Sequence, residues 1–318
     1  MAKSKTLVIL TPSAEHLKNG LESKTDVATF LPNKDGKLEF PDGESYIRLP
    51  EVDDYERIML VHSGLPDTDK GLFQLDYAFY YLVTKGKMVD IFFTKFPYDR
   101  QDQEFQKGEI NIARKLLEKY SEHYTGPRNV YLLEPHFGGR SWLEDLQRNP
   151  SRDIKLVSAV PLLKREFEKN YSDFVYVAPD KGAARRFGID LHLEKERINS
   201  NKVELSIPEN VKRSINGKYV ALLDDIIATG GTSKNAADAL KNAGAKDVAL
   251  LATHITIETG LWVCHDYQMY FTNSTNLWAR LQNSKQDSAG SYKCDKWTQA
   301  KRHEVDISEL ILEQCLNK

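Results

Sequence analysis

Residues 219–232 read Tyr-Val-Ala-Leu-Leu-Asp-Asp-Ile-Ile-Ala-Thr-Gly-Gly-Thr. The first five are apolar or aromatic, which is typical of a buried strand in a parallel sheet. Asp224 and Asp225 follow at the expected carboxyl end of that strand, the edge at which open α/β sheets bind ligands. A helix is predicted over 233–242, ending at Gly244. The stretch therefore predicts a strand, a loop and a helix, with a ligand site in the loop.

The loop has the composition of a phosphate site. Two glycines allow the backbone to turn its N–H groups inward, and the helix N-terminus adds a positive field. The two carboxylates that precede the loop can accept hydrogen bonds from hydroxyls. The expected ligand therefore carries both a diol and a phosphate, as a ribose 5-phosphate unit does. The candidate contacts are Asp224, Asp225, Ala228, Thr229, Gly230, Gly231 and Thr232. The alternative is a tight strand-to-helix turn that binds nothing.

The composition favours a cytoplasmic α/β protein. At 318 residues the length suggests about two domains, and 41% hydrophobic residues suffice for two cores. No window approaches 18 uninterrupted apolar residues, so no membrane span is expected. The net charge of −2 offers no electrostatic case for nucleic acid or an anionic membrane. Cys264, Cys294 and Cys315 lack CxxC spacing, which indicates reduced thiols rather than a disulfide or zinc site.

Predicted strands and helices alternate along the whole chain. This alternation predicts an α/β fold with two similar domains, each built on a central, mostly parallel sheet flanked by helices. The boundary is expected in the polar loop 148–155, giving domains 1–155 and 156–318, with 303–318 a candidate to pack back on the first domain. The principal predicted strands are 6–10, 58–61, 88–94, 130–133, 174–178, 249–253 and 269–272, and the principal helices are 69–83 and 160–169.

Three segments of the first half carry polar side chains next to predicted strands. Phe-Pro-Asp-Gly-Glu at 40–44 is a turn entering a strand through Ile47 and Leu49. After strand 88–94, Arg100 can clamp a phosphate and Gln101 can read an amine edge. His136 follows strand 130–133. Each segment has an alternative interpretation. For the 40–44 turn and the loop with Arg100 and Gln101 it is a solvent-exposed segment that binds nothing, and for His136 it is a structural role.

Two further segments of the second half are candidates. Asp180 ends strand 174–178, and Gly-Ala-Ala then opens a helix, an arrangement that often faces a phosphate or a metal. Lys195, Glu196 and Arg197 lie on a predicted exposed hairpin. Charged side chains on such a hairpin are normally solvated and bind nothing. For Asp180, the alternative is an ordinary turn between a strand and a helix.

The run through Thr232 resembles the phosphoribosyl-diphosphate binding motif of the type I phosphoribosyltransferase fold. A whole αβ domain precedes it, and that arrangement resembles the ribose-phosphate diphosphokinase family. The 40–44 turn is similar to the family's Phe-x-Asp-Gly-Glu, which contacts adenine, and 97–102 to its ATP-contacting Pro-Tyr-x-Arg-Gln-Asp. Residues 134–136 resemble Asp-Leu-His or Asp-Pro-His, 179–183 resemble Pro-Asp-x-Gly in its archaeal variant, and 195–197 resemble Lys-Arg-Arg of the mobile catalytic loop.

The resemblance implies transfer of the diphosphoryl group of ATP to the anomeric hydroxyl of ribose 5-phosphate. It also implies magnesium and a homo-oligomer of two or more copies, in which the 40–44 turn reaches a neighbouring subunit's ATP site. It assigns ATP to Phe40, Asp42, Gly43, Glu44, Arg100, Gln101 and Asp102, Mg²⁺ to His136 and Asp180, and catalysis to Lys195 and Arg197. The rival expectations are a phosphoribosyltransferase that consumes phosphoribosyl diphosphate and a non-catalytic regulatory paralogue.

The sequence departs from the family pattern at several points. Ala228 stands where many members have Asp and others Ser, and Glu134 replaces the usual Asp. Residues 137–142 do not match the family's helix after the histidine, and 276–303 is longer than expected. The resemblance therefore does not extend to one phosphate contact, to the usual oligomer contacts or to an allosteric site.

Overall fold

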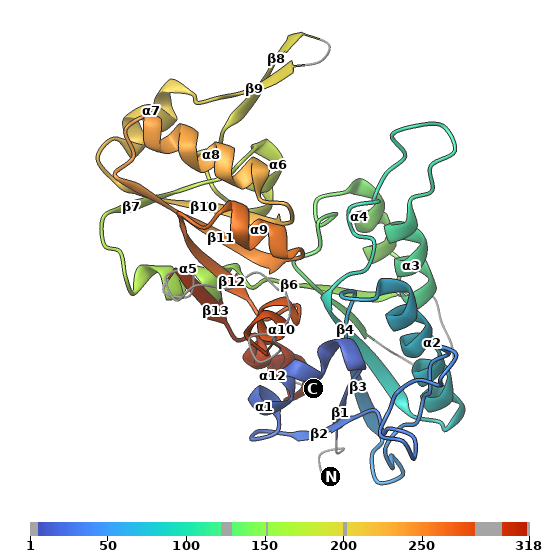
Figure 1. The fold of residues 1–318 in the computed structure, drawn as a ribbon. Helices are drawn as coiled ribbons and strands as arrows, with labels where there is room; N and C mark the ends of the chain where they lie inside the picture. The colour runs from blue at the N-terminus through green and yellow to red at the C-terminus, as the bar shows by residue number, and fades with distance from the viewer. Residues whose placement is uncertain (1–5, 122–128, 151, 200–201, 284–300, 317–318) are drawn as a thin grey trace. The chain divides into compact units, whose positions relative to one another are not determined.

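The protein is described by a computed structural model covering residues 6–121, 129–150, 152–199, 202–283 and 301–316. Contacts divide the chain into two compact units (Figure 1). Unit 1 comprises Met1–Ser158, Ser274–Asn276 and Asp306–Lys318, and unit 2 comprises Ala159–Asn273 and Leu277–Val305. Each unit has its own parallel sheet and its own buried core, which confirms the predicted fold class.

Unit 1 is built on a six-stranded parallel sheet in the order β2-β1-β3-β4-β5-β6. Its strands are β1 (Thr6–Leu10), β2 (Asp26–Thr29), β3 (Arg57–Ser63), β4 (Met88–Lys95), β5 (Asn129–Leu133) and β6 (Asp153–Val157). Its helices are η1 (Pro12–Leu17), α1 (Lys18–Leu21), α2 (Thr68–Thr84), α3 (Ile112–Ser121), α4 (Ser141–Gln147) and α12 (Ser308–Leu316). Leu75 of α2, Leu117 of α3 and Leu143 of α4 share one apolar cluster with the sheet.

Segments from late in the chain complete unit 1. The hydroxyls of Ser63 and Thr94, at the carboxyl ends of β3 and β4, donate to the carbonyl of Ser274 over 3.2 and 2.7 Å. Helix α1 lies against α12 so closely that a Cβ on Gly20 would lie 2.2 Å from the Ser308 hydroxyl. These contacts tie residues near the C-terminus into the first sheet's unit.

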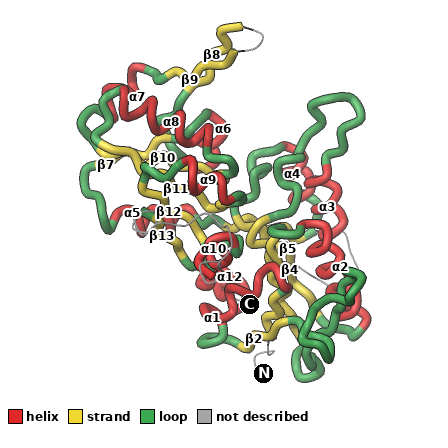
Figure 2. The backbone as a smooth tube through the Cα atoms, viewed as in Figure 1, coloured by secondary structure: helices red, strands yellow, loops and turns green. Residues whose placement is uncertain are grey.

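Unit 2 is built on a five-stranded parallel sheet in the order β13-β12-β11-β10-β7. Its strands are β7 (Phe174–Val177), β10 (Tyr219–Ile227), β11 (Asp247–Ile255), β12 (Gln268–Thr272) and β13 (Arg302–Val305). Its helices are α5 (Val160–Glu168), α6 (Lys181–Phe187), α7 (Glu209–Ile215), α8 (Gly231–Asn242), α9 (Glu258–Val263) and α10 (Leu277–Asn283). An antiparallel hairpin, β8 (Glu194–Asn199) and β9 (Lys202–Ser206), projects from this unit (Figure 2).

The structure corrects three local predictions. Strand β10 does not end before Asp224 but continues to Ile227, because the Ile-Ile pair keeps the strand paired with β11. The backbone at Ile47 and Leu49 forms no strand. The carbonyl of Arg48, between them, accepts from the N–H of Leu31 at 2.8 Å. Strand β6 occupies part of the stretch expected to be a loop.

Candidate functional site

The loop between β10 and α8 presents backbone at a helix N-terminus. Gly230 adopts a left-handed φ of 81°, which turns the chain, and its carbonyl accepts from Lys234 N–H at 2.8 Å in the first turn of α8. A Cβ on Gly231 would meet nothing within 4 Å, and Thr229 and Thr232 are exposed. This open, N–H-rich turn has the geometry that binds phosphate.

The residues that flank α9 contact this loop, a feature that the sequence analysis did not predict. Thr256 N–H donates to the carbonyl of Ile227 at 3.1 Å, where β10 ends. The thiol of Cys264, just after α9, lies 3.5 Å from the carbonyl oxygen of Gly230. Burial raises the pKa of that thiol to about 11, so it stays protonated and can donate to the carbonyl.

The two adjacent acids of β10 have different surroundings. Asp225 is buried and accepts from the Arg186 guanidinium at 3.0 Å. Asp224 is half-buried, and its carboxylate accepts from the Asp225 N–H at 2.9 Å. Burial and the neighbouring Asp225 charge raise the pKa of the Asp224 carboxyl well above its ordinary value. Arg186 was missed at the sequence level, where its only signal was an arginine on the helix after a neighbouring strand.

Asp180 lies at the same edge of the sheet. It follows β7, the hydrogen-bonded neighbour of β10, and it caps α6, accepting from Ala183 N–H at 3.0 Å. Unit 2 therefore brings Asp180, Arg186, Asp224 and the loop to the carboxyl ends of adjacent strands. His136, the other predicted metal ligand, is half-buried after β5 in unit 1, so a metal site shared by the two stays a prediction.

The hairpin prediction is confirmed for the backbone. Lys195 pairs with Leu205 and Arg197 with Val203 in the antiparallel β8–β9 ladder, with Glu196 opposite Glu204. The roles of the Lys195 and Arg197 side chains stay predictions. Cys294 lies outside the described residues, while Cys264 and Cys315 are free and buried.

The predicted adenine-contacting turn is an exposed, well-bonded loop of unit 1. Phe40 N–H donates to the Glu44 carbonyl at 2.8 Å, and Gly43 takes a left-handed φ of 92° to close the turn. Glu44 N–H donates to the Asp42 carboxylate at 3.2 Å. The Phe40 ring is 44% exposed, so it is available to stack on a planar ligand.

The Arg100–Asp102 segment divides into an exposed part and a buried part. Arg100 is exposed and Gln101 is half-buried, whereas the Asp102 carboxylate is buried and accepts two hydrogen bonds from Arg140, at 2.6 and 3.3 Å. Trp142 donates to the Asp102 carbonyl at 3.0 Å. The 137–142 segment, which departs from the family pattern, therefore anchors this loop. Its Arg140 and Trp142 side chains both donate to Asp102.

Within the described ranges, no group of three or more His, Cys, Asp or Glu side chains is placed to hold a metal ion. Magnesium commonly takes only one or two protein carboxylates together with substrate phosphates, so the Asp180 carboxylate is a chemically suitable donor. The same residues include no helix long and apolar enough to span a membrane.

Comparisons with known proteins agree with this architecture. Residues 162–296 match the family model described as "Phosphoribosyl transferase domain". The chain is 32% identical over 228 residues to a ribose-phosphate pyrophosphokinase of Sulfolobus acidocaldarius, covering 68% of this chain and 74% of that protein. It is 28% identical over 257 residues to the Pyrococcus furiosus protein of that name, covering 78% and 85%. The fold matches the crystal structure of phosphoribosylpyrophosphate synthetase from Mycobacterium smegmatis with a TM-score of 0.70 at 19% identity, covering 98% of this chain and 97% of that one.

Proposed function

This chain belongs to the ribose-phosphate pyrophosphokinase family, and we propose that its β10–α8 loop binds the ribose 5-phosphate that receives the diphosphoryl group. The activity is transfer of the diphosphoryl group of ATP to the anomeric hydroxyl of ribose 5-phosphate, giving 5-phosphoribosyl 1-diphosphate and AMP. The observation that carries the site assignment is the open, glycine-turned loop of residues 228–232, which follows β10 at the carboxyl edge of the sheet two residues after a pair of acids.

The two acids take different roles in this proposal. Asp224, which is half-buried, accepts hydrogen bonds from the ribose hydroxyls. Asp225 is already paired with Arg186, so it acts by holding that guanidinium and the end of β10 in place. Thr229, Gly230, Gly231 and Thr232 surround the 5-phosphate, and Ala228 contributes backbone only.

The proposal assigns the nucleotide to unit 1. Arg100 and Gln101 contact the phosphates or the base, and Phe40, Asp42, Gly43 and Glu44 contact adenine, from a neighbouring copy of the chain. The exposure of Phe40 and Arg100 supports this assignment, because both side chains are available to a ligand. Asp102 acts as a positioning residue through its ion pair with Arg140.

Phosphoryl transfer depends mainly on positioning and on neutralising charge. Asp180 and His136 would hold Mg²⁺, which when bound neutralises charge on the phosphates. Lys195 and Arg197 stabilise the charge that develops on the transferring group, and a donor of this kind is typically worth about 3–4 kcal/mol. Their place on a projecting hairpin suits a lid that closes over bound substrates.

The proposal also includes a homo-oligomer in the cytoplasm. Two of the three cysteines are free and buried, which suits a reducing compartment. The oligomer follows from assigning the 40–44 turn to a neighbouring copy's nucleotide site.

The direct test is to incubate the purified chain with ATP, ribose 5-phosphate and Mg²⁺ and to follow products by phosphorus NMR. We expect AMP and 5-phosphoribosyl 1-diphosphate in equal amounts. A phosphoribosyltransferase would instead consume 5-phosphoribosyl 1-diphosphate when offered a base, and a regulatory paralogue would yield neither product. The last two results would overturn the assigned reaction.

A further inference from the structure

The loop that follows β4 contains a buried ion pair beside the proposed nucleotide contacts. Lys95 is the last residue of β4 and Asp99 lies four residues later. Their side chains form a salt bridge, which we call the β4 ion pair, and they are only 5% and 4% exposed. The ammonium of Lys95 also donates to the carbonyl of Phe96 at 3.2 Å. Arg100, the residue after Asp99, is exposed, so the chain passes directly from a buried anchor to a side chain that a ligand can reach.

The backbone between the two members of the pair takes a sparsely populated conformation. Tyr98 has a left-handed φ of 54°, and its carbonyl accepts from the Gln101 N–H at 2.9 Å, which closes a four-residue turn. In the described part of the chain, the other two non-glycine residues with a left-handed φ are Asp67 and Glu134, which follow β3 and β5, the neighbours of β4. Such conformations persist only where surrounding contacts enforce them, and they are common at ligand sites. The turn that presents Arg100 therefore needs an enforcing contact.

The β4 ion pair is better suited to enforcing a conformation than to adding stability. Moving two charges out of water costs free energy that their mutual attraction only partly returns, and apolar residues of similar volume often stabilise a protein equally well. A hydrogen-bonded pair of charges is directional, however, and adds geometric specificity that an apolar contact lacks. The pair therefore fixes the turn at Tyr98 in one geometry.

We propose that the β4 ion pair is a positioning pair, which holds the turn so that Arg100 and Gln101 can contact ATP. Asp102, a second buried carboxylate, lies on the other side of these two residues and accepts from Arg140 at 2.6 Å. The proposed nucleotide contacts are thus flanked by two buried aspartates, each paired with a cation. This inference rests on the proposed function, because it takes Arg100 and Gln101 to bind the nucleotide.

The test measures the affinity of the full chain for ATP with Mg²⁺ by calorimetry, without ribose 5-phosphate, so no turnover is needed. The pair variant is Lys95→Met/Asp99→Asn, which removes both charges together and leaves no unpaired buried charge. A second form, Lys95→Met/Asp99→Leu, replaces the pair by apolar side chains in case the first does not fold. The matched control is Arg57→Met/Asp90→Asn, which removes the buried ion pair near the amino ends of β3 and β4. Arg100→Ala, alone and combined with the pair variant, completes the set.

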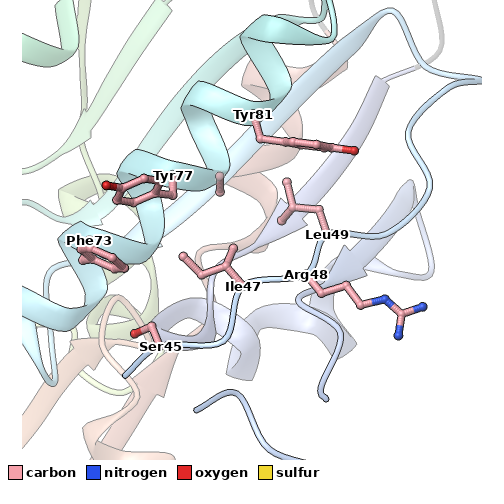
Figure 3. Close-up of a pocket in the computed structure, with 8 residues that line it drawn as sticks. Ser45, Ile47, Arg48, Leu49, Phe73, Tyr77 and Tyr81 are labelled. Atoms are coloured by element: carbon pink, nitrogen blue, oxygen red, sulfur yellow. The ribbon is translucent and has the colours of Figure 1, made fainter. Parts of the chain in front are cut away.

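These variants leave the region beside the adenine-contacting turn unchanged. Residues 45–49 directly follow the 40–44 turn, and Figure 3 shows the pocket that they form with α2. The side chains that line this pocket come from residues 45–49 and from α2, whereas both ion pairs belong to β3, β4 and the loop after β4. A change in ATP affinity in the pair variant therefore reports on the loop after β4.

We expect Arg100→Ala and the pair variant each to weaken ATP binding at least about tenfold, because a displacement of about 1 Å in a positioning element is costly. The combined variant should bind ATP little more weakly than the weaker of the two, since a pair that acts through Arg100 loses its effect once that side chain is removed. The control should keep the parent's affinity. Urea unfolding will verify that the double variants are folded.

The possible failures are distinguishable. Equal losses in the pair variant and in the control would show a general loosening of unit 1. Parent-like affinity in the pair variant, or losses that multiply fully in the combined variant, would show that the pair does not act through Arg100, while leaving the nucleotide assignment intact. Parent-like affinity in Arg100→Ala, or a parent chain that does not bind ATP, would overturn the nucleotide assignment and the positioning role with it.

Discussion

Gly260 lies against Gly230 and Ala228 of the β10–α8 loop, and its position has no room for a side chain. A Cβ on Gly230 would lie 3.0 Å from the Gly260 carbonyl oxygen, and a Cβ on Gly260 would lie 2.2 Å from the Ala228 carbonyl oxygen. Real Cβ atoms do not come within 3.0 Å of a backbone atom, so a side chain at Gly260 must displace the loop. Helix α9 therefore fixes the position of the proposed phosphate loop.

Gly260→Ala should raise the KM for ribose 5-phosphate while leaving the KM for ATP nearly unchanged. A shift of about 1 Å in a positioning element can cost about a hundredfold in rate, so we expect at least a tenfold loss in kcat/KM for the sugar. Thr259→Ala is the control, since this neighbouring residue of α9 is exposed. Equal changes in both KM values would show general destabilisation and not loss of positioning.

Asp224→Asn should impair sugar binding and yet stabilise the fold at neutral pH. Because the folded-state pKa of Asp224 is raised above the unfolded value, the charged carboxylate costs stability once the pH rises through that folded-state value. The asparagine variant does not carry this cost, so its urea midpoint should exceed the parent's at pH 7. The difference should vanish below the ordinary aspartate pKa of about 3.9. A midpoint difference independent of pH would contradict this account.

Arg186→Met should destabilise the protein strongly, because it removes the guanidinium that lies 3.0 Å from the buried Asp225 carboxylate. Removing one partner of a buried ion pair typically costs about 3–5 kcal/mol. Arg185→Met, on the exposed neighbouring position of α6, should change the free energy of unfolding by less than about 0.5 kcal/mol. Urea unfolding of the two variants gives the comparison, and equal losses would show that the Arg186–Asp225 pair is unimportant.

His62→Gln should flatten the acid dependence of stability. His62 is fully buried in unit 1, with Nδ1 3.0 Å from the Thr11 hydroxyl, and burial lowers its pKa from 6.5 to about 3. As the pH falls below 6.5 the unfolded chain takes up this proton first, so stability is lost down to about pH 3, by up to about 1.4 kcal/mol per pH unit. Glutamine can still hydrogen-bond but does not titrate. Parallel urea midpoints for parent and variant from pH 7 to pH 4 would refute this.

Lys195→Ala and Arg197→Ala should each reduce kcat at least about a hundredfold with little change in KM, the pattern of a group that acts in the transition state. Alternate residues of a strand project to opposite sides, so Glu196→Ala should be nearly silent. Steady-state kinetics of the three variants test this. If Glu196→Ala were as damaging as the other two, residues 195 and 197 would not share the catalytic side of the hairpin.

Much of the fold could be predicted because its strands are short apolar runs with polar ends. The run 219–223 and the helix pattern of 69–83 needed no tertiary information. The end of β10 could not be predicted, because two acids inside a strand are unfavourable until Arg186 from another element compensates one of them. The ion pair between Asp102 and Arg140 could not be predicted either, because Arg140 comes from a segment that does not match the family pattern. Sequence patterns identify which side chains can bind, whereas only the fold shows which of them are already engaged by the protein.

The placement of Ser274 and α12 in unit 1 bears on synthesis of the chain. The carbonyl that accepts from Ser63 and Thr94, and the helix that packs on Gly20, are made only after nearly all of unit 2. On the ribosome, unit 1 is begun first but cannot be completed until these late residues have been synthesised. Unit 2 is interrupted only by Ser274–Asn276 and can gather its strands as they emerge. The order of completion is thus expected to run opposite to the order of translation, with the first-made half the last to become resistant to proteases.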